Sequence, residues 1–174
     1  MLPSALLFVF VLITAVGDAH AQTQTFGAWK VSTDKSAYAW AGTINESGHV
    51  FGQFCDFSDG SCRWVVGMGT GCNPGDRYPV LVNSNEGSEG MEVSCQGELA
   101  GTPGTYTYAF TDFDEVTSHM AKGGRIGIAI PLNGDQFRVV RFDLTGAPAA
   151  IASMRALASS KTRATRQGTR DTRL

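Results

Sequence analysis

The alternation of apolar and polar positions along the chain predicts a series of short β-strands. Alternation over several residues is typical of a strand with one buried face. It occurs in segments 25–32, 37–44 and 105–110, which are also rich in aromatic and β-branched residues. Three hairpins are predicted where such segments flank a turn. Their strands are 49–57 with 62–68, 78–83 with 91–97, and 125–132 with 136–144. Segment 84–90 links the second pair, and an Asn-Gly-Asp turn at 133–135 links the third.

The apolar period changes to that of a helix between residues 111 and 124. Phe113, Val116 and Met120 fall on one helical face, acidic residues occupy the start, and Lys122 followed by a glycine marks the end. Pro148 begins a second, short helix. The sequence therefore predicts a single mainly-β domain, a sandwich or a barrel, with one mid-chain helix and a short C-terminal helix.

The first residues have the pattern of a signal peptide, predicted to cover residues 1–21. The apolar run from Leu6 to Val16 is too short to span a bilayer, and the small residues Ala19 and Ala21 suit a cleavage site. An uncleaved anchor or a buried first helix is the alternative. No later segment is apolar enough to cross a membrane. We therefore expect the protein in the periplasm or outside the cell.

Charge divides the rest of the chain at Ala158. Residues 22–158 hold nine Lys or Arg and fourteen Asp or Glu, whereas residues 159–174 hold five basic residues and one acidic residue. We therefore predict a β-rich domain, 22–158, followed by a disordered basic tail, 159–174. A solubilising tail with no partner is favoured, and the alternative is weak contact with an anionic surface. The mildly acidic body does not suit nucleic acid.

Four cysteines lie after the predicted signal peptide, and an even number in an exported protein indicates disulfides. They are Cys55, Cys62, Cys72 and Cys95. No two cysteines have the C-x2-C spacing that is typical of zinc sites and of thioredoxin-like redox sites. Metal and redox roles are therefore disfavoured. Four cysteines allow three pairings.

The hairpin around Asp59 and Gly60 favours one of these pairings. A two-residue turn would set Cys55 diagonally from Cys62, too far for a disulfide. A four-residue loop, 57–60, sets the two cysteines directly opposite and gives Gly60 a position where a left-handed backbone is natural. The same register gathers the apolar residues of both strands on one face. We therefore favour Cys55–Cys62 and, by subtraction, Cys72–Cys95.

Three segments resemble a known family. They are "FGAWKV" (26–31), "FDEVTSHMAKGGRIGIAI" (113–130) and "FDLTGAPAAIASM" (142–154), which follow a signal peptide. This layout resembles the invasion-associated locus B family of exported bacterial proteins. The family often has a cysteine where this chain has Ser32. The resemblance implies a secreted or periplasmic envelope protein with a role in host interaction, and it supplies no catalytic residues.

Few side chains suggest chemistry. His119 falls in the last turn of the predicted helix, where a cation favours the helix dipole, and His49 falls in a turn. Asp112 and Glu115 stand at the start of that helix, where a capping role is favoured over an acid pair. Trp29, Trp40 and Trp64 suit a sugar-binding face, but in a sheet protein tryptophans more often belong to the core.

One acidic loop has the oxygen-bearing side chains of a calcium site. These residues are Asn83, Asn85, Glu86 and Glu89. The loop lacks the glutamate at position twelve and the flanking helices of a calcium-binding hand, and hairpin loops are rich in such residues anyway. No metal or cofactor is therefore expected.

No nucleophile elbow, phosphate-binding loop or dinucleotide fingerprint occurs in the sequence. The sequence favours an exported, disulfide-stapled, non-enzymatic interaction protein whose partner is a protein or an envelope component. One alternative is an enzyme acting on a cell-envelope polymer, with Asp112 or Glu115 and His119 at its site. The other is a protein inhibitor of such an enzyme.

Overall fold

The computed structural model describes residues 23–32, 37–121, 123–132 and 136–171, with the backbone alone at 168–171. The predicted signal peptide and its cleavage site lie outside the described residues. So do Lys122 at the end of the mid-chain helix and the Asn-Gly-Asp turn at 133–135.

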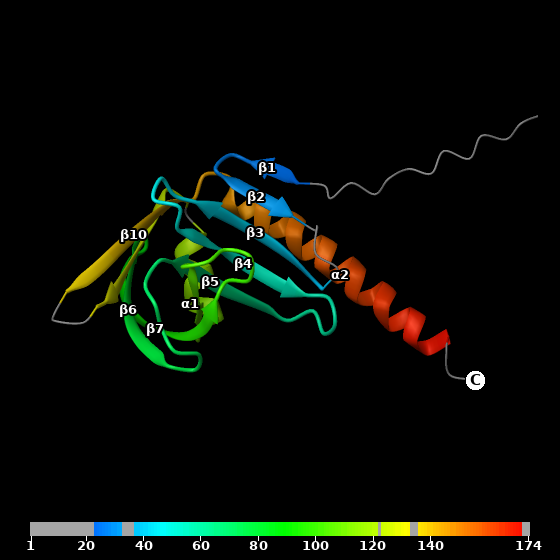
Figure 1. The fold of residues 1–174 in the computed structure, drawn as a ribbon. Helices are drawn as coiled ribbons and strands as arrows, with labels where there is room; N and C mark the ends of the chain where they lie inside the picture. The colour runs from blue at the N-terminus through cyan, green and yellow to red at the C-terminus, as the bar shows by residue number, and fades with distance from the viewer. Residues whose placement is uncertain (1–22, 33–36, 122, 133–135, 172–174) are drawn as a thin grey trace, which may run out of the picture.

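Ten antiparallel strands form one sheet in the order β1-β2-β3-β4-β5-β8-β7-β6-β9-β10 (Figure 1). The strands are β1 (Gln24–Phe26), β2 (Trp29–Ser32), β3 (Tyr38–Ile44), β4 (Val50–Asp56), β5 (Cys62–Met68), β6 (Arg77–Ser84), β7 (Gly87–Glu98), β8 (Tyr106–Phe110), β9 (Arg125–Pro131) and β10 (Phe137–Asp143). The two helices are α1 (Phe113–Met120) and α2 (Ala147–Asp171). The single mainly-β domain with a mid-chain and a C-terminal helix is therefore confirmed.

The sheet is open but strongly curved. Its order ends at β1 and β10, so it is not closed into a barrel. The curvature nevertheless brings β10 near β3 and β4, which lie far from it in the strand order. The rings of Phe51 and Phe142 lie 5.4 Å apart, and Asn45 donates from Nδ2 to the carbonyl oxygen of Arg141 at 3.2 Å. The two halves of one sheet thus face each other across a shared core, as in a sandwich.

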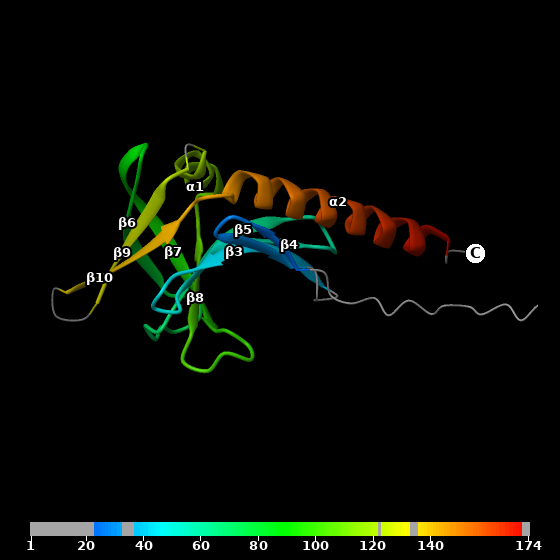
Figure 2. The ribbon, with the colours of Figure 1, turned by 90° about the horizontal axis from the view of Figure 1, so that it is seen from above.

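The core is centred on aromatic rings from separate strands. Phe51 stacks on Trp64 at 5.4 Å, and Trp29 meets both edge-on. Helix α2 packs on β1 to β4, and α1 packs on β5 and β6. In Figure 2 both helices lie on the same side of strands β3 to β5. Apolar burial on this scale is the main stabilising contribution to such a fold.

The hairpin of β4 and β5 has the predicted register. Cys55 lies opposite Cys62, and the amide of Asp56 donates to the carbonyl oxygen of Ser61 at 2.9 Å. Gly60 has a φ of 80°, the left-handed conformation expected at the last loop position. Both predicted disulfides, Cys55–Cys62 and Cys72–Cys95, are present. The argument from register is therefore confirmed.

The single strand predicted over 25–32 is wrong, because the chain reverses at Gly27. Phe26 pairs with Trp29 across a two-residue turn, so β1 and β2 are separate strands. Gly27 has a φ of 58°, and the next amide, of Ala28, donates to the carbonyl oxygen of Thr145 at 2.9 Å. A Cβ at Gly27 would lie 2.6 Å from that same carbonyl oxygen. The turn therefore depends on a distant segment and on a residue without a side chain.

The seven-residue linker predicted at 84–90 is also wrong. Ser84 pairs with Gly87, so the strands continue to a two-residue turn at Asn85 and Glu86. Strand β7 is consequently twelve residues long. The polar residues of the predicted loop instead extend β6 and β7, because β-pairing satisfies their backbone groups regardless of side-chain polarity.

Helix α2 continues to Asp171, through the segment predicted as a disordered tail. Ala158 and Thr162 are buried, and Arg166 donates from Nη2 to the carbonyl oxygen of Asp59 at 3.3 Å. The polar, basic composition of this segment suggested disorder. However, Ala, Lys, Arg and Gln are good helix formers, and extending a helix is far easier than starting one. Contact of this basic segment with an anionic surface stays a prediction.

Candidate functional site

Helix α1 carries the acidic and histidine residues singled out in the sequence. Asp112 is its N-cap, and its side chain accepts from the amide of Glu115 at 3.0 Å. The capping role predicted for Asp112 is therefore confirmed. Val116 and Met120 are buried on the face predicted to pack, which fixes the rotation of α1 against the sheet.

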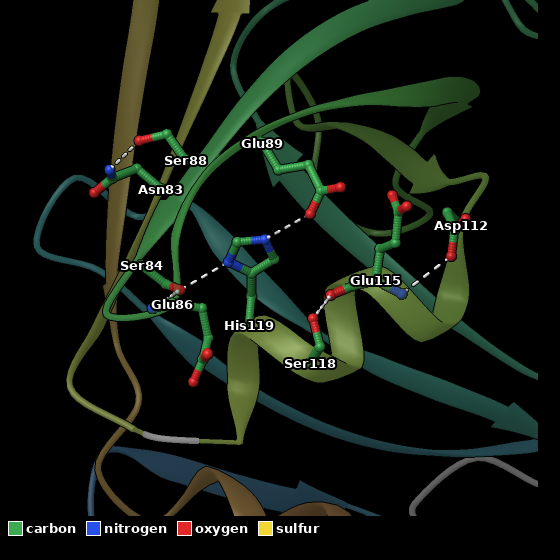
Figure 3. Close-up of polar contacts among 9 residues, drawn as sticks. All are labelled: Asn83, Ser84, Glu86, Ser88, Glu89, Asp112, Glu115, Ser118 and His119. Carbon is green, nitrogen blue, oxygen red and sulfur yellow. Dashed lines mark hydrogen bonds and ion pairs between the residues drawn. The ribbon is translucent and has the colours of Figure 1, made fainter.

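His119 links α1 to the hairpin of β6 and β7 (Figure 3). Its ring lies between Ser84 and Glu89, with Nδ1 2.7 Å from Ser84 Oγ and Nε2 3.2 Å from Glu89 Oε2. Only 4% of the His119 side chain is exposed, against 45% for Glu89. With the ring proton on Nε2, the imidazole donates to the Glu89 carboxylate and accepts from the Ser84 hydroxyl. The sequence placed His119 correctly in the last turn but gave no sign of these two partners.

A serine, a histidine and a carboxylate in series also occur in hydrolases with a nucleophilic serine. Here the Ser84 oxygen additionally accepts from the amide of Glu86 at 3.1 Å, so the hydroxyl is held within its own turn. None of the three residues lines the clefts described below. The arrangement therefore acts as a polar link between helix and hairpin, which satisfies a buried imidazole.

Glu115 lies one helical turn from His119 and close to Glu89. Desolvation, and then the negative charges of Asp112 and Glu89, raise the pKa of Glu115 above its ordinary value. A hydrogen bond with Glu89 acts in the same direction. The negative charge of Glu89 thus disfavours the charged form of Glu115.

The residues of the acidic loop, which were not expected to bind a metal, lie on strands β6 and β7 and in the two-residue turn between them. Asn83 lies on β6 and donates to Ser88 Oγ on β7 at 2.6 Å, and Glu89 accepts from His119 instead. Within the described ranges, no group of three or more His, Cys, Asp or Glu side chains is arranged to hold a metal ion. His49 lies in the β3–β4 turn as predicted, and burial followed by the charge of Arg138 lowers its pKa.

The three tryptophans occupy different environments. Trp29 and Trp64 are fully buried and belong to the core. Their indole nitrogens donate to the carbonyl oxygen of Asp143 at 2.9 Å and to Thr117 Oγ1 at 3.0 Å. Trp40 is half-buried and stacks on Phe54 at 6.3 Å. The structure therefore does not bring the three indoles together on one accessible face.

A groove of about 740 Å³ lies elsewhere, between the β5–β6 connection and strands β8 and β9. We call it the tyrosine groove. It is lined by Thr70, Gly71, Cys72, Asn73, Tyr78, Tyr106, Tyr108, Ile130, Pro131 and Leu132. Two smaller clefts, of about 360 and 220 Å³, contain fewer tyrosines. Concave sites with aromatic walls and a few polar groups are the usual sites of ligand binding.

The Cys72–Cys95 disulfide ties one wall of the tyrosine groove to strand β7. Backbone hydrogen bonds reinforce this attachment, from Cys95 to the Asp76 carbonyl oxygen at 2.8 Å and from Gly75 to that of Cys95 at 2.9 Å. The Gly- and Pro-rich β5–β6 connection is therefore fixed at Cys72, Gly75 and Asp76. A fixed wall favours binding, because less conformational freedom is lost when a ligand arrives.

Three tyrosines form the aromatic part of the groove. Tyr108 is buried, and its hydroxyl donates to the carbonyl oxygen of Thr70 at 2.8 Å. Tyr78 meets it edge-on at 5.8 Å and donates from its own hydroxyl to Asp76 at 3.3 Å. Desolvation is the main cause that raises the pKa of Tyr108 to about 12. Tyr78 and Tyr106 are half-buried, so part of each remains accessible.

This groove was not predicted from the sequence. Tyr106 and Tyr108 are two residues apart on one strand, which places both on the same face and was an available signal. Tyr78 and Pro131 come from strands that no local pattern connects to them. Their proximity depends on β6 and β9 pairing side by side, a long-range feature of the sheet.

The fold, an open and curved antiparallel sheet with two helices on one side, has a relative among solved structures. The chain is similar to the crystal structure of invasion associated protein b from Bartonella henselae, with a TM-score of 0.59 and 16% sequence identity. The alignment covers 80% of this chain and 99% of that one. At this identity the likeness shows the fold alone, and at that level the predicted resemblance is confirmed.

No protein-family model matches the chain, and no curated protein matches it in sequence. Neither helix in the described part of the chain is long and apolar enough to span a bilayer. The two disulfides fit a location outside the cytoplasm, where thiols are readily oxidised.

Proposed function

We propose that the protein is an exported interaction protein, which binds its partner through the tyrosine groove without changing it chemically. The observation that carries this proposal is the groove itself, the largest of the three clefts described, with aromatic walls and one wall fixed by a disulfide. Its lining contains no His, Asp, Glu or Lys, and the hydroxyls of Tyr78 and Tyr108 already donate to protein oxygens.

Two further observations support the proposal. The Ser84–His119–Glu89 series lies outside the groove, so the residues most suited to catalysis and the best binding site are separate. The structural relative is named an invasion associated protein, which supports a role in host interaction. That support comes from a shared fold and from a name, and it identifies no partner.

A capture experiment tests the proposal. The protein without its predicted signal peptide, and its Gly71→Val variant, are immobilised and exposed to envelope and host-cell extracts. Gly71 has no left-handed φ, and a Cβ there would lie 3.7 Å from the Tyr106 ring, so valine adds bulk to the groove without backbone strain. We expect the variant to lose a component that the parent protein retains.

Chemical labelling of the protein tests the alternative that it is an enzyme. A fluorophosphonate reagent labels nucleophilic serines, and we expect it to leave Ser84 unmodified because Ser84 lines none of the three clefts and its oxygen is held by the amide of Glu86. Equal capture by both proteins, or covalent labelling of Ser84, would overturn the proposal. Labelling would favour a hydrolase acting on an envelope polymer.

A further inference from the structure

We infer that the ligand of the tyrosine groove is a neutral oligosaccharide, with one sugar ring stacked on the accessible faces of Tyr78 and Tyr106. This inference rests on the proposed function and names the chemical class of its ligand. It follows from three properties of the groove, which are accessible aromatic faces, unused hydrogen-bonding capacity and the absence of cationic residues from its lining.

One of the aromatic faces, that of Tyr78, is held in place before any ligand arrives. Tyr78 is fixed at both ends, by its edge-on contact with Tyr108 and by its hydroxyl bond to Asp76. Tyr106 lies beside Gly71, where the missing side chain leaves space next to the ring. The face of an aromatic ring is electronegative, whereas the C–H groups on one face of a sugar are weakly electropositive, so the two stack.

The polar groups around these rings suit hydroxyl groups. Asn73 donates from Nδ2 to Asp76 Oδ2 at 3.1 Å, which leaves a second amide proton and the amide oxygen of Asn73 for a ligand. Thr70 Oγ1 is buried and has no hydrogen-bond partner among the described residues. A buried hydroxyl without a partner is costly, so this atom favours a ligand or a water that can both donate and accept.

The charge of the groove lining further narrows the chemical class of the ligand. No Lys or Arg belongs to the lining. The charge of Arg138 acts on Tyr108 from outside the lining, so the lining itself offers no cation to a phosphate or an acidic sugar. Proline-rich peptides also bind in tyrosine-lined grooves, but mainly through apolar contacts along an extended helix. The Asn73–Asp76 pair and the unpartnered Thr70 hydroxyl favour a ligand with many hydroxyl groups over such a peptide.

Calorimetric titration with soluble neutral oligosaccharides, of the hexose and N-acetylhexosamine series, tests the inference. The variants are Tyr106→Ala, which removes one face, and Gly71→Val, which fills the groove. Tyr38→Ala is the matched control, because Tyr38 is another half-buried tyrosine but lines a different cleft. We expect about tenfold weaker binding for Tyr106→Ala, loss for Gly71→Val and no change for Tyr38→Ala. Added salt should not weaken the binding, because stacking involves no ion pair.

Three results would overturn the inference. They are no binding of any oligosaccharide at about 1 mM, equal binding by all variants, or binding of a proline-rich peptide that Gly71→Val abolishes. Gly71→Val remains decisive if Tyr106→Ala does not fold, because it removes no core contact. If Gly71→Val still loses a component captured from extracts while no oligosaccharide binds, only the ligand class is wrong and the proposed function stands.

Discussion

Arg155 donates from Nε to Oε1 of Gln53 at 2.7 Å, and Gln53 is completely buried. The same guanidinium lies 5.3 Å from the centroid of the Phe113 ring. One side chain of α2 therefore contacts strand β4 and helix α1 at once. Gln53 Nε2 and Arg155 Nη2 are buried without partners among the described residues, so this polar junction is only partly satisfied.

Replacing Arg155 by alanine should destabilise the protein by about 2–3 kcal/mol, because it leaves the Gln53 amide buried and unpaired. Urea denaturation of Arg155→Ala measures this loss. Arg163→Ala is the control, since Arg163 is exposed and donates only within its own helix. The double variant Gln53→Leu with Arg155→Met should recover most of the stability, because two apolar partners leave no unpaired group. Equal stability of Arg155→Ala and Arg163→Ala would refute this role.

The two disulfides should differ in their effect on binding. In the chain-entropy account, removing Cys55–Cys62 costs about 2.5 kcal/mol and removing Cys72–Cys95 about 3.4 kcal/mol, because the second closes the longer loop. Only Cys72–Cys95 fixes a wall of the tyrosine groove. Serine replacement of that pair should therefore weaken partner binding, whereas replacement of the other pair should not. Non-reducing peptide mapping verifies the pairing, and equal binding by both double variants would contradict the role of the wall.

Glu115→Gln should stabilise the protein near neutral pH. The pKa of Glu115 is raised in the folded state, so the folded protein holds this proton more tightly than the unfolded chain. That contribution is present at acid pH and is lost as pH rises through the folded-state pKa. Between pH 4 and 8, the melting temperature of the variant relative to that of the parent protein should increase with pH. Glu46→Gln, an exposed turn residue, is the control, and an equal gain there would exclude a specific effect at Glu115.

Truncation after Ala158 should lower the melting temperature by about 3 °C. The removed segment includes the buried Thr162, and its Oγ1 lies 3.6 Å from where a Cβ at Gly60 would stand. It also includes the contact of Arg166 with the Asp59 carbonyl oxygen. An unchanged melting temperature would contradict a stabilising role of these contacts and would agree with the disordered tail predicted from the sequence.

Tyr108 should titrate late, because desolvation raises its pKa to about 12. Ultraviolet absorbance of tyrosinate, followed with pH, should show Tyr108 ionising near pH 12 while the protein stays folded. Because the unfolded phenol ionises near its ordinary pKa, stability should fall between about pH 10 and 12. Tyr108→Phe should remove the late step. If a late step persists in this variant, a tyrosine other than Tyr108 is the one that ionises late.

Local chemistry explains what could be predicted from the sequence. The β4–β5 register follows from a geometric requirement on Cys55 and Cys62, together with one glycine at a left-handed position. The N-cap at Asp112 follows from residues within one helical turn. In both cases the determining groups lie within a few residues of each other, where spacing fixes distance.

The features that escaped prediction depend on contacts between distant segments. The turn at Gly27 requires the carbonyl oxygen of Thr145, and the final turns of α2 rest on the β4–β5 loop. The partners of His119 come from a hairpin whose strands extend further than polarity suggests. The tyrosine groove requires β8 to lie between β5 and β7, an order that alternation along a single strand does not reveal.

The most direct test of the account is a map of ligand contacts on the folded protein. Backbone and tyrosine side-chain resonances are followed by nuclear magnetic resonance while the bound neutral oligosaccharide is titrated in. The account predicts that shifts concentrate at Tyr78, Tyr106 and the 70–73 segment, with none at His119 or along α2. Shifts centred on His119 and Ser84, or on the basic end of α2, would contradict the claim that this protein acts through its tyrosine groove.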